Sequence, residues 1–264
     1  MDRIENLKEL VYGLLQEDTR YSNIHVPGDL KGLQDLLRAL VNVRMPNELP
    51  EGLWELQDME LQAQKCDKGV VNPNSIPPSP SNPRLRLWQG DITRLAVDAI
   101  VNAANSQMLG CFVPHHKCID NAIHSAAGMQ LREECASIMK AQGFDEPTGQ
   151  AKITHGYNLP SKWVIHTVGP IVFGNSPTEE DCRLLTDCYS NCLKLAEEKE
   201  MESIAFCCIS TGEFHFPQDK AAEIAIETVR SYIGRNKNSS LKAIIFNVFK
   251  DSDYLIYKKL LGYG

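Results

Sequence analysis

From residue 84 to residue 264, short apolar runs typical of buried strands alternate with longer amphipathic stretches typical of helices. This alternation predicts an α/β fold, a three-layer α/β/α sandwich around a mostly parallel, mixed sheet. In such sheets the ligand binds beyond the carboxyl ends of the strands. The expected strands are residues 84–89, 97–102, 151–154, 163–168, 204–209 and 243–249, and the expected helices are residues 119–139, 178–198, 217–233 and 251–261.

The first 71 residues differ from the rest, because apolar residues recur there only at helical spacing. We expect helices in residues 2–17, in the segment after Asp29 and from residue 52 to about residue 65, forming a small subdomain that buttresses the larger domain or carries a partner surface. Residues 72–83 hold five prolines in twelve positions, which excludes a helix or a central strand. We therefore expect a helical N-terminal extension in residues 1–71, a proline-rich linker in residues 72–83 and the α/β domain in residues 84–264.

Charge and composition exclude several classes of protein. The net charge is −7, which disfavours nucleic acid as a partner, so an anionic ligand must be held locally by backbone N–H groups. No stretch approaches the roughly 18 apolar residues of a membrane span, and the sequence starts as an amphipathic helix, not as a signal peptide. We expect a cytoplasmic, reducing location, in which the nine cysteines pack, react or bind metal.

Soft metal ligands gather in the loop expected between residues 102 and 119. Cys111, His116 and Cys118 form a Cys-x4-His-x-Cys set, with His115 as a spare imidazole. Thiolate and imidazole together suit zinc, and three protein ligands leave a coordination position open for catalysis. The spacing alone leaves three alternatives: a catalytic zinc, a structural zinc with a distant fourth ligand, and no metal, because cysteines also serve as small core residues. A disulfide between Cys111 and Cys118 would need an oxidising compartment.

Three further loops follow expected strands. Asp91 either accepts a hydrogen bond from an exocyclic amine or caps a helix. The Ser-Thr-Gly run at residues 210–212 precedes a helix and indicates either a phosphate-binding loop or an ordinary turn. His215 in the same loop is a metal or ribose contact, or is merely solvated. Phe249 ends the last strand and either stacks on a flat base or belongs to the core.

Taken in chain order, six motifs resemble the macrodomain family over residues 84–264. That family binds ADP-ribose, and many of its members remove ADP-ribose from proteins. The resemblance implies a mostly parallel six-stranded sheet, mixed at an edge and placed between helices. The motifs are residues 90–93 (Gly-Asp-Ile-Thr), 97–105 (Val-Asp-Ala-Ile-Val-Asn-Ala-Ala-Asn), 120–124 (Asp-Asn-Ala-Ile-His), 127–128 (Ala-Gly), 166–170 (His-Thr-Val-Gly-Pro) and 210–212 (Ser-Thr-Gly).

The resemblance also implies a set of ADP-ribose-binding residues. Asp91 would contact adenine with Ile92 beside it, and Phe249 would be the aromatic partner of adenine. Asn105 and Phe216 would lie near the distal ribose, and Asp120 near the ribose as a catalytic residue together with Asn105. Asp120 or Asn121 could instead simply cap the helix that follows. The complete implied set is Asp91, Ile92, Asn105, Asp120, Ser210, Thr211, Gly212, Glu213, His215, Phe216 and Phe249.

One departure from the general family pattern points to a particular branch. Ordinary hydrolytic macrodomains have a glycine-rich run where this chain has residues 110–118. The motif Cys-Phe-x-Pro-x-His-x-Cys-Ile-Asp-Asn is similar to that of zinc-dependent macrodomains of bacteria and some fungi, which also carry a helical N-terminal extension. This likeness selects His116 over His115 and implies Zn²⁺ bound by Cys111, His116 and Cys118.

The resemblance therefore implies a zinc-dependent protein mono-ADP-ribosyl hydrolase that cleaves an ester between ADP-ribose and a protein Asp or Glu. The zinc is expected to orient the ribose and the ester carbonyl, with water activation shared with Asp120. By analogy with microbial members, the partners would be a lipoylated carrier protein of the glycine-cleavage H type and a sirtuin-type ADP-ribosyltransferase. Two alternatives are a non-catalytic ADP-ribose reader with a structural zinc and a scaffold that binds no nucleotide.

Overall fold

The computed structural model describes residues 2–48, 50–174 and 176–263. In the described chain a seven-stranded sheet has the order β1-β2-β7-β6-β3-β5-β4. The five inner strands run parallel to one another, whereas the edge strands β1 and β4 run antiparallel to the strands beside them. The strands are β1 (Pro78–Ser79), β2 (Asn82–Gln89), β3 (Ala99–Ala104), β4 (Ala151–His155), β5 (Trp163–Val168), β6 (Ser203–Phe206) and β7 (Ala243–Val248).

The mostly parallel mixed sheet confirms the predicted fold class, with one strand more than the six expected. The additional strand, β1, lies inside the proline-rich segment that was expected to be only an extended connector. Proline is tolerated there because an edge strand needs no donor on its outer side. The Ser79 hydroxyl also donates a hydrogen bond to the Leu261 carbonyl at 2.7 Å, which ties this edge to the end of the chain.

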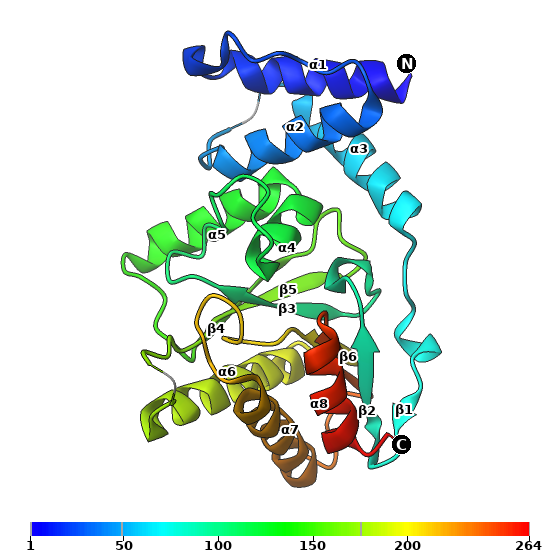
Figure 1. Ribbon diagram of the computed structural model, residues 1–264, viewed down its shortest axis with the longest axis vertical. Coiled ribbons are helices and arrows are strands. Elements are labelled where there is room, and N and C mark those ends of the chain that lie inside the picture. The colour runs from blue at the N-terminus through cyan, green and yellow to red at the C-terminus, as the bar shows by residue number, and fades with distance from the viewer. Residues whose placement is uncertain (1, 49, 175, 264) are drawn as a thin grey trace.

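Helices cover both faces of the sheet (Figure 1). On one side lie α4 (Ile119–Ala127) and α5 (Met129–Gln142), and on the other lie α6 (Glu179–Glu198), α7 (Gln218–Arg235) and α8 (Asp251–Leu261). The single helix expected over residues 119–139 is two helices, because Gly128 adopts φ 101° and ends α4. Glycine adopts this φ without strain, and a side chain there would also crowd the ends of Gln130 and Gln57 at 2.7 and 2.8 Å.

Three helices precede the sheet and stack on the α4–α5 side (Figure 1). They are α1 (Arg3–Gln16), α2 (Leu30–Val43) and α3 (Leu53–Lys68), and their leucines form a second apolar core that also contains Met129 of α5. Buried Glu60 in α3 accepts hydrogen bonds from Arg3, Gln34 and Gln64, which joins the three helices. The proposed division of the chain at residues 72–83 stays a prediction. None of the described helices is both long and apolar enough to cross a membrane.

Candidate active site and metal centre

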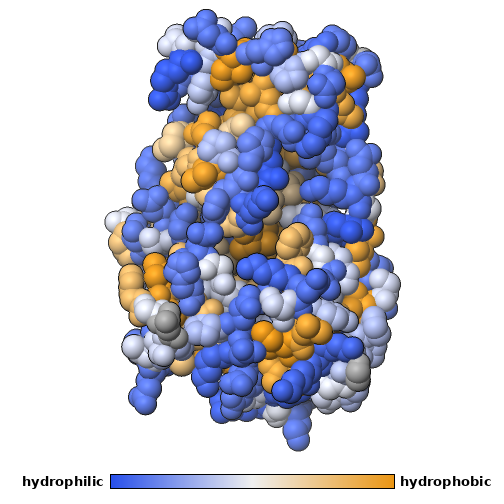
Figure 2. All heavy atoms as spheres, in the orientation of Figure 1, coloured by the Kyte–Doolittle hydropathy of each residue, from blue (hydrophilic) through white to orange (hydrophobic). Residues whose placement is uncertain are grey.

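A cleft of about 1400 Å³ opens at the carboxyl ends of the parallel strands, where the α/β topology predicts a ligand site. Its walls include the loops that follow β2, β3, β6 and β7, and residues of α2 and α3 close its other side. Figure 2 shows this face of the molecule hollowed about midway along its long axis, with hydrophobic residues inside the hollow.

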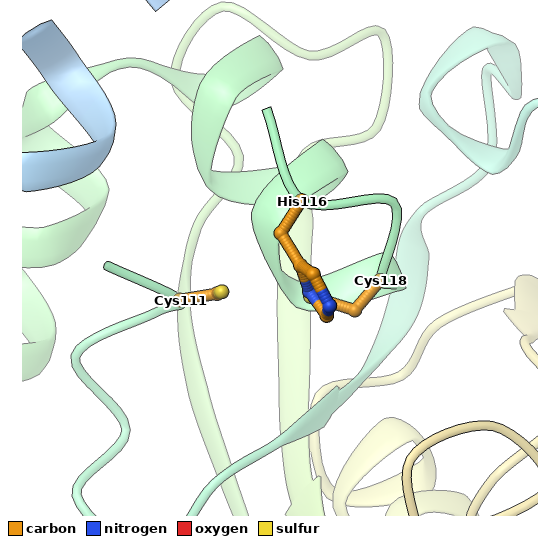
Figure 3. A group of neighbouring side chains, drawn as sticks. All are labelled: Cys111, His116 and Cys118. Atoms are coloured by element: carbon orange, nitrogen blue, oxygen red, sulfur yellow. The ribbon is translucent and has the colours of Figure 1, made fainter. Parts of the chain in front are cut away.

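Cys111, His116 and Cys118 come together in this cleft. Their candidate ligand atoms all lie within 4.8 Å of one another, and His115 is not a member of the group. Cys111 approaches from the loop after β3, whereas His116 and Cys118 come from the segment that enters α4 (Figure 3). The Cys118 Sγ also caps α4, because it accepts a hydrogen bond from the Asn121 backbone N–H at 3.4 Å.

The donor set fits a zinc ion. All nine cysteines are free, so no disulfide joins Cys111 and Cys118. In the absence of a metal, burial, reinforced by the nearby Cys111 and Asp120, raises the pKa of the Cys118 thiol to about 12. A thiol that coordinates a metal ion is instead deprotonated outright. The His116 Nδ1 is buried and has no hydrogen-bond partner among the described residues. Two thiols and an imidazole whose candidate ligand atoms lie within 4.8 Å of one another are the kind of ligands that zinc prefers.

Gly110 lets the loop after β3 approach α4. It has φ 80°, and a Cβ at this position would lie 2.9 Å from the His124 ring. Any other residue would therefore push Cys111 away from the cleft or displace His124.

A second soft-ligand cluster, His124, Cys135 and His166, is fully buried beneath the cleft and was not predicted from the sequence. His166 Nδ1 lies 3.2 Å from the Asn102 amide nitrogen, and its Nε2 lies 2.9 Å from Thr154 Oγ1. Burial lowers the pKa of His166 to about 3. Both ring nitrogens of His124 lack a hydrogen-bond partner in the described chain, but both His166 nitrogens are engaged, so this cluster is the weaker metal candidate.

Asp120 lies in the first turn of α4 and lines the cleft, although only 5% of it is exposed. Its Oδ1 accepts a hydrogen bond from the Asn102 amide at 2.8 Å and lies 3.5 Å from His124 Nε2. Burial raises the pKa of Asp120 to about 6, against the opposing effects of Asn102 and Arg132. Because Cys118 caps α4, the alternative that Asp120 or Asn121 is merely the cap is wrong.

Asn105 follows β3 and lines the same part of the cleft. Its amide nitrogen donates to the Gly110 carbonyl at 3.1 Å, which fixes the orientation of the side chain. Its Oδ1 is buried and has no hydrogen-bond partner in the described chain. A buried amide oxygen without a donor is suited to accept a hydrogen bond from a ligand hydroxyl.

The loop after β6 offers backbone donors. Ser210, Thr211, Gly212 and Glu213 line the cleft, and no acceptor among the described residues receives a hydrogen bond from the N–H groups of residues 211–213. Ser210 has φ 64°, so the chain turns sharply here. Successive free N–H groups in such a turn form an anion-binding concavity.

The structure does not bring the other two residues predicted from this loop to the cleft. Among the described residues, the cleft lining omits His215 and Phe216, and Phe216 is only 2% exposed in the main core. The aromatic residue of this loop that lines the cleft is instead Phe214. His215 has φ 57°, so the chain turns between Phe214 and Phe216, and a motif match alone does not report this turn.

Asp91, Ile92 and Phe249 gather at the other end of the cleft. Asp91 Oδ1 caps a short 3₁₀ helix, η3 (Ile92–Arg94), through the Thr93 N–H at 3.0 Å, while its Oδ2 lies 3.6 Å from Lys68 Nζ of α3. The expected cap is therefore present, and the other carboxylate oxygen lies beside Lys68, which also lines the cleft. Phe249 is 76% exposed, so the alternative that it belongs to the core is wrong.

The cleft also contains side chains from the N-terminal helices, which the sequence did not predict. These include Lys31, Gln34, Arg38, Gln64 and Lys68. They stand on the polar faces of α2 and α3, and nothing in their spacing distinguishes them from ordinary solvated residues. Only the packing of these helices over α4 brings them to the site.

The fold and the cleft together define an α/β protein with a ligand-sized cleft at the carboxyl ends of its strands and a candidate three-ligand metal centre. Residues 101–225 match the Macro domain family. The chain is 49% identical over 255 residues to the protein-ADP-ribose hydrolase of Treponema medium, an alignment that covers 96% of this chain and 97% of the relative. This chain belongs to the macrodomain family, as the sequence resemblance implied.

Two other comparisons extend this result. A probable bifunctional ADP-ribose hydrolase/ADP-ribosyltransferase of Fusarium oxysporum is 45% identical over 242 residues, which is 86% of this chain but 40% of that protein. The crystal structure of the Trypanosoma brucei macrodomain in complex with ADP-ribose aligns with a TM-score of 0.66 at 29% identity, covering 85% of this chain and 95% of that one.

Proposed function

We propose that this protein is a zinc-dependent protein-ADP-ribose hydrolase that releases ADP-ribose from an ester of a protein Asp or Glu. The observation that carries the proposal is the convergence of Cys111, His116 and Cys118 beside Asp120 and Asn105 at one end of the cleft. The name of the Treponema medium relative, which is similar over nearly the full length of both chains, supports the activity.

Cys111, His116 and Cys118 would hold the zinc, which would supply Lewis acidity beside the ribose, moderated because two thiolates offset its 2+ charge. The buried Asn105 Oδ1, which has no partner in the described chain, would accept a hydrogen bond from a ribose hydroxyl and so fix the sugar. Asp120 would hold the attacking water and accept its proton. Hydrolysis then gives free ADP-ribose and the protein carboxylate.

The remaining loops would bind the nucleotide. The free N–H groups of residues 211–213 would hold the pyrophosphate. Phe249 would stack on adenine, and the Asp91 carboxylate would accept a hydrogen bond from the exocyclic amine. Phe214, which reaches the cleft, replaces Phe216 as the aromatic residue proposed at this loop.

The substrate we propose is a modified carrier protein, namely a lipoylated protein of the glycine-cleavage H type, with a sirtuin-type transferase as the opposing enzyme. Sequence resemblance alone supports these partners. The name of the Fusarium oxysporum relative, which combines hydrolase and transferase, supports the pairing of the two activities.

Metal removal distinguishes a zinc-dependent hydrolase from a non-catalytic ADP-ribose reader with a structural zinc. The expected result is that a chelator abolishes turnover of a glutamate-linked ADP-ribosylated protein, that zinc restores it, and that free ADP-ribose still binds by calorimetry. Zinc analysis before chelation should give one ion per chain, because the cleft cluster fits zinc better than the buried cluster at His166, the other candidate in the described chain. Full turnover by metal-free protein would contradict zinc dependence, and no turnover by zinc-loaded protein would favour the reader.

Phe249→Ala is expected to weaken ADP-ribose binding by about 1–3 kcal/mol, since a stacked ring contributes that much to base binding. Its ring is exposed at the cleft, so its loss should not unfold the core. The matched control is Phe173→Ala, because Phe173 is 88% exposed and does not line the cleft in the described structure. Isothermal titration of both variants measures the effect, and equal affinities would remove Phe249 from the adenine site.

A further inference from the structure

The loop that carries the metal ligands has little structure of its own. Residues 105–118 contain no helix or strand in the described chain. Within the loop, the Asn105 amide holds the Gly110 carbonyl, and the His116 N–H donates to the Val113 carbonyl at 3.2 Å. Contacts from outside the loop must therefore fix the positions of Cys111, His116 and Cys118.

Arg38 of α2 supplies one of these contacts. Its guanidinium donates to the Asn121 side-chain oxygen at 2.9 Å and to the His116 carbonyl at 3.4 Å. Asn121 is 1% exposed, its backbone N–H donates to Cys118 Sγ, and its amide nitrogen donates to the Val113 carbonyl at 3.0 Å. Arg38 thus acts on the backbone of one ligand directly and on the sulfur of another through a single residue.

Asn42, one helical turn further along α2, supplies the second contact. Its side-chain oxygen accepts a hydrogen bond from the His115 N–H at 3.0 Å, and its amide nitrogen donates to Ser125 Oγ of α4 at 3.0 Å. Asn42 is 1% exposed, so both of its bonds are shielded from water. His115 has φ 57°, and the Asn42 bond holds this unfavourable turn next to His116.

Arg132 of α5 links the ligand loop to α2 by a third set of contacts. Its guanidinium donates to the Val41 carbonyl of α2 at 2.8 Å and to the Leu109 carbonyl of the loop at 2.6 Å. It is 5% exposed and also lies 4.4 Å from the centroid of the Phe112 ring. The end of α2 and the start of the ligand loop are therefore bound through one buried cation.

We infer that α2 of the N-terminal extension is part of the metal centre, with Arg38 and Asn42 as positioning residues for the zinc ligands. The inference rests on the proposed function, because it assumes that Cys111, His116 and Cys118 hold zinc. Buried polar contacts behind the ligands fix their geometry, and losing such a contact typically weakens metal binding by about 10- to 100-fold. The extension is thus more than a buttress: without α2 the three ligands lose their preset arrangement.

The test measures zinc binding directly and does not depend on enzyme activity. Full-length wild-type protein, Arg38→Met and Asn42→Ala are titrated with zinc against a chromophoric chelator, and their Co²⁺-substituted forms are compared by absorption spectroscopy. Both variants should bind zinc about 10- to 100-fold more weakly, with altered thiolate–Co²⁺ bands. The control is Arg44→Met, because Arg44 caps the same helix but pairs with Glu17 at 2.7 Å instead of touching the loop.

The possible outcomes distinguish failure of the proposed function from failure of the positioning role. If wild-type protein binds no stoichiometric zinc, the proposed function and this inference both fail. If wild-type protein binds zinc and the Arg38 and Asn42 variants bind it equally well, only this inference fails. If Arg44→Met weakens binding as much as Arg38→Met does, general destabilisation explains the loss and the positioning role is overturned. Thermal unfolding is measured for all four proteins, so that differences in zinc affinity can be compared with differences in stability.

Discussion

Cys118→Ala is expected to lose zinc and hydrolytic turnover together, while the cleft still binds free ADP-ribose. Removing one of three protein ligands leaves two, which is too few for a site that zinc normally fills with three or four. Loss of a contact behind the ligands already costs about 10- to 100-fold in activity or affinity, so loss of a ligand should exceed about 100-fold. Metal analysis and turnover of an ADP-ribosylated protein are measured on the same preparation.

Cys118 Sγ also caps α4, so part of the loss could come from the helix itself. Circular dichroism and ADP-ribose calorimetry separate the two effects, because a frayed α4 would also move Asp120. Cys66→Ala is the control, since Cys66 is exposed and does not line the cleft in the described structure. A Cys118 variant that is fully active without metal would contradict the proposed mechanism.

The sequence predicts the architecture well, because strand and helix periodicities are local properties of the chain. The boundaries move where tertiary contacts decide them. The strand expected at residues 204–209 ends at Phe206, since the chain turns away to build the loop at Ser210. The helix expected at residues 119–139 breaks at Gly128, where Gln57 of α3 receives the Met129 N–H at 2.8 Å. Gln57 lies far from Gly128 in the sequence, so no local pattern reports this contact.

The functional site likewise has features that the local sequence predicts and features that depend on long-range contacts. The metal triad is predicted because all three ligands lie within eight residues, and the structure brings them together at the cleft. The roles of Arg38 and Asn42 were not predicted, because their partners are more than seventy residues away. Phe216 was placed near the distal ribose by motif resemblance, whereas the structure buries Phe216 in the core and lines the cleft with Phe214.

The second prediction with a large effect concerns Asp120. Asp120→Asn keeps the size of the side chain and an oxygen able to accept the Asn102 hydrogen bond, but it removes the base. We expect turnover to fall about 10²- to 10⁴-fold, the usual contribution of a positioned general base. The affinity for ADP-ribose and the zinc content should change little, because the metal ligands and the loop at residues 211–213 remain. Single-turnover kinetics, calorimetry and metal analysis measure these three properties.

The control for Asp120→Asn is Asp98→Asn. Asp98 directly precedes β3, at the end of the strand away from the cleft. Asp98 accepts hydrogen bonds from Lys162 at 2.8 Å and from the Ser203 N–H at 3.0 Å, so its loss should lower stability without touching the cleft. A fall in turnover that appears in both variants would reflect stability. A fall confined to Asp120→Asn, with ADP-ribose and zinc still bound, requires a group that acts on the reacting atoms. An unchanged rate would remove Asp120 from the chemistry and leave proton transfer to another residue of the cleft.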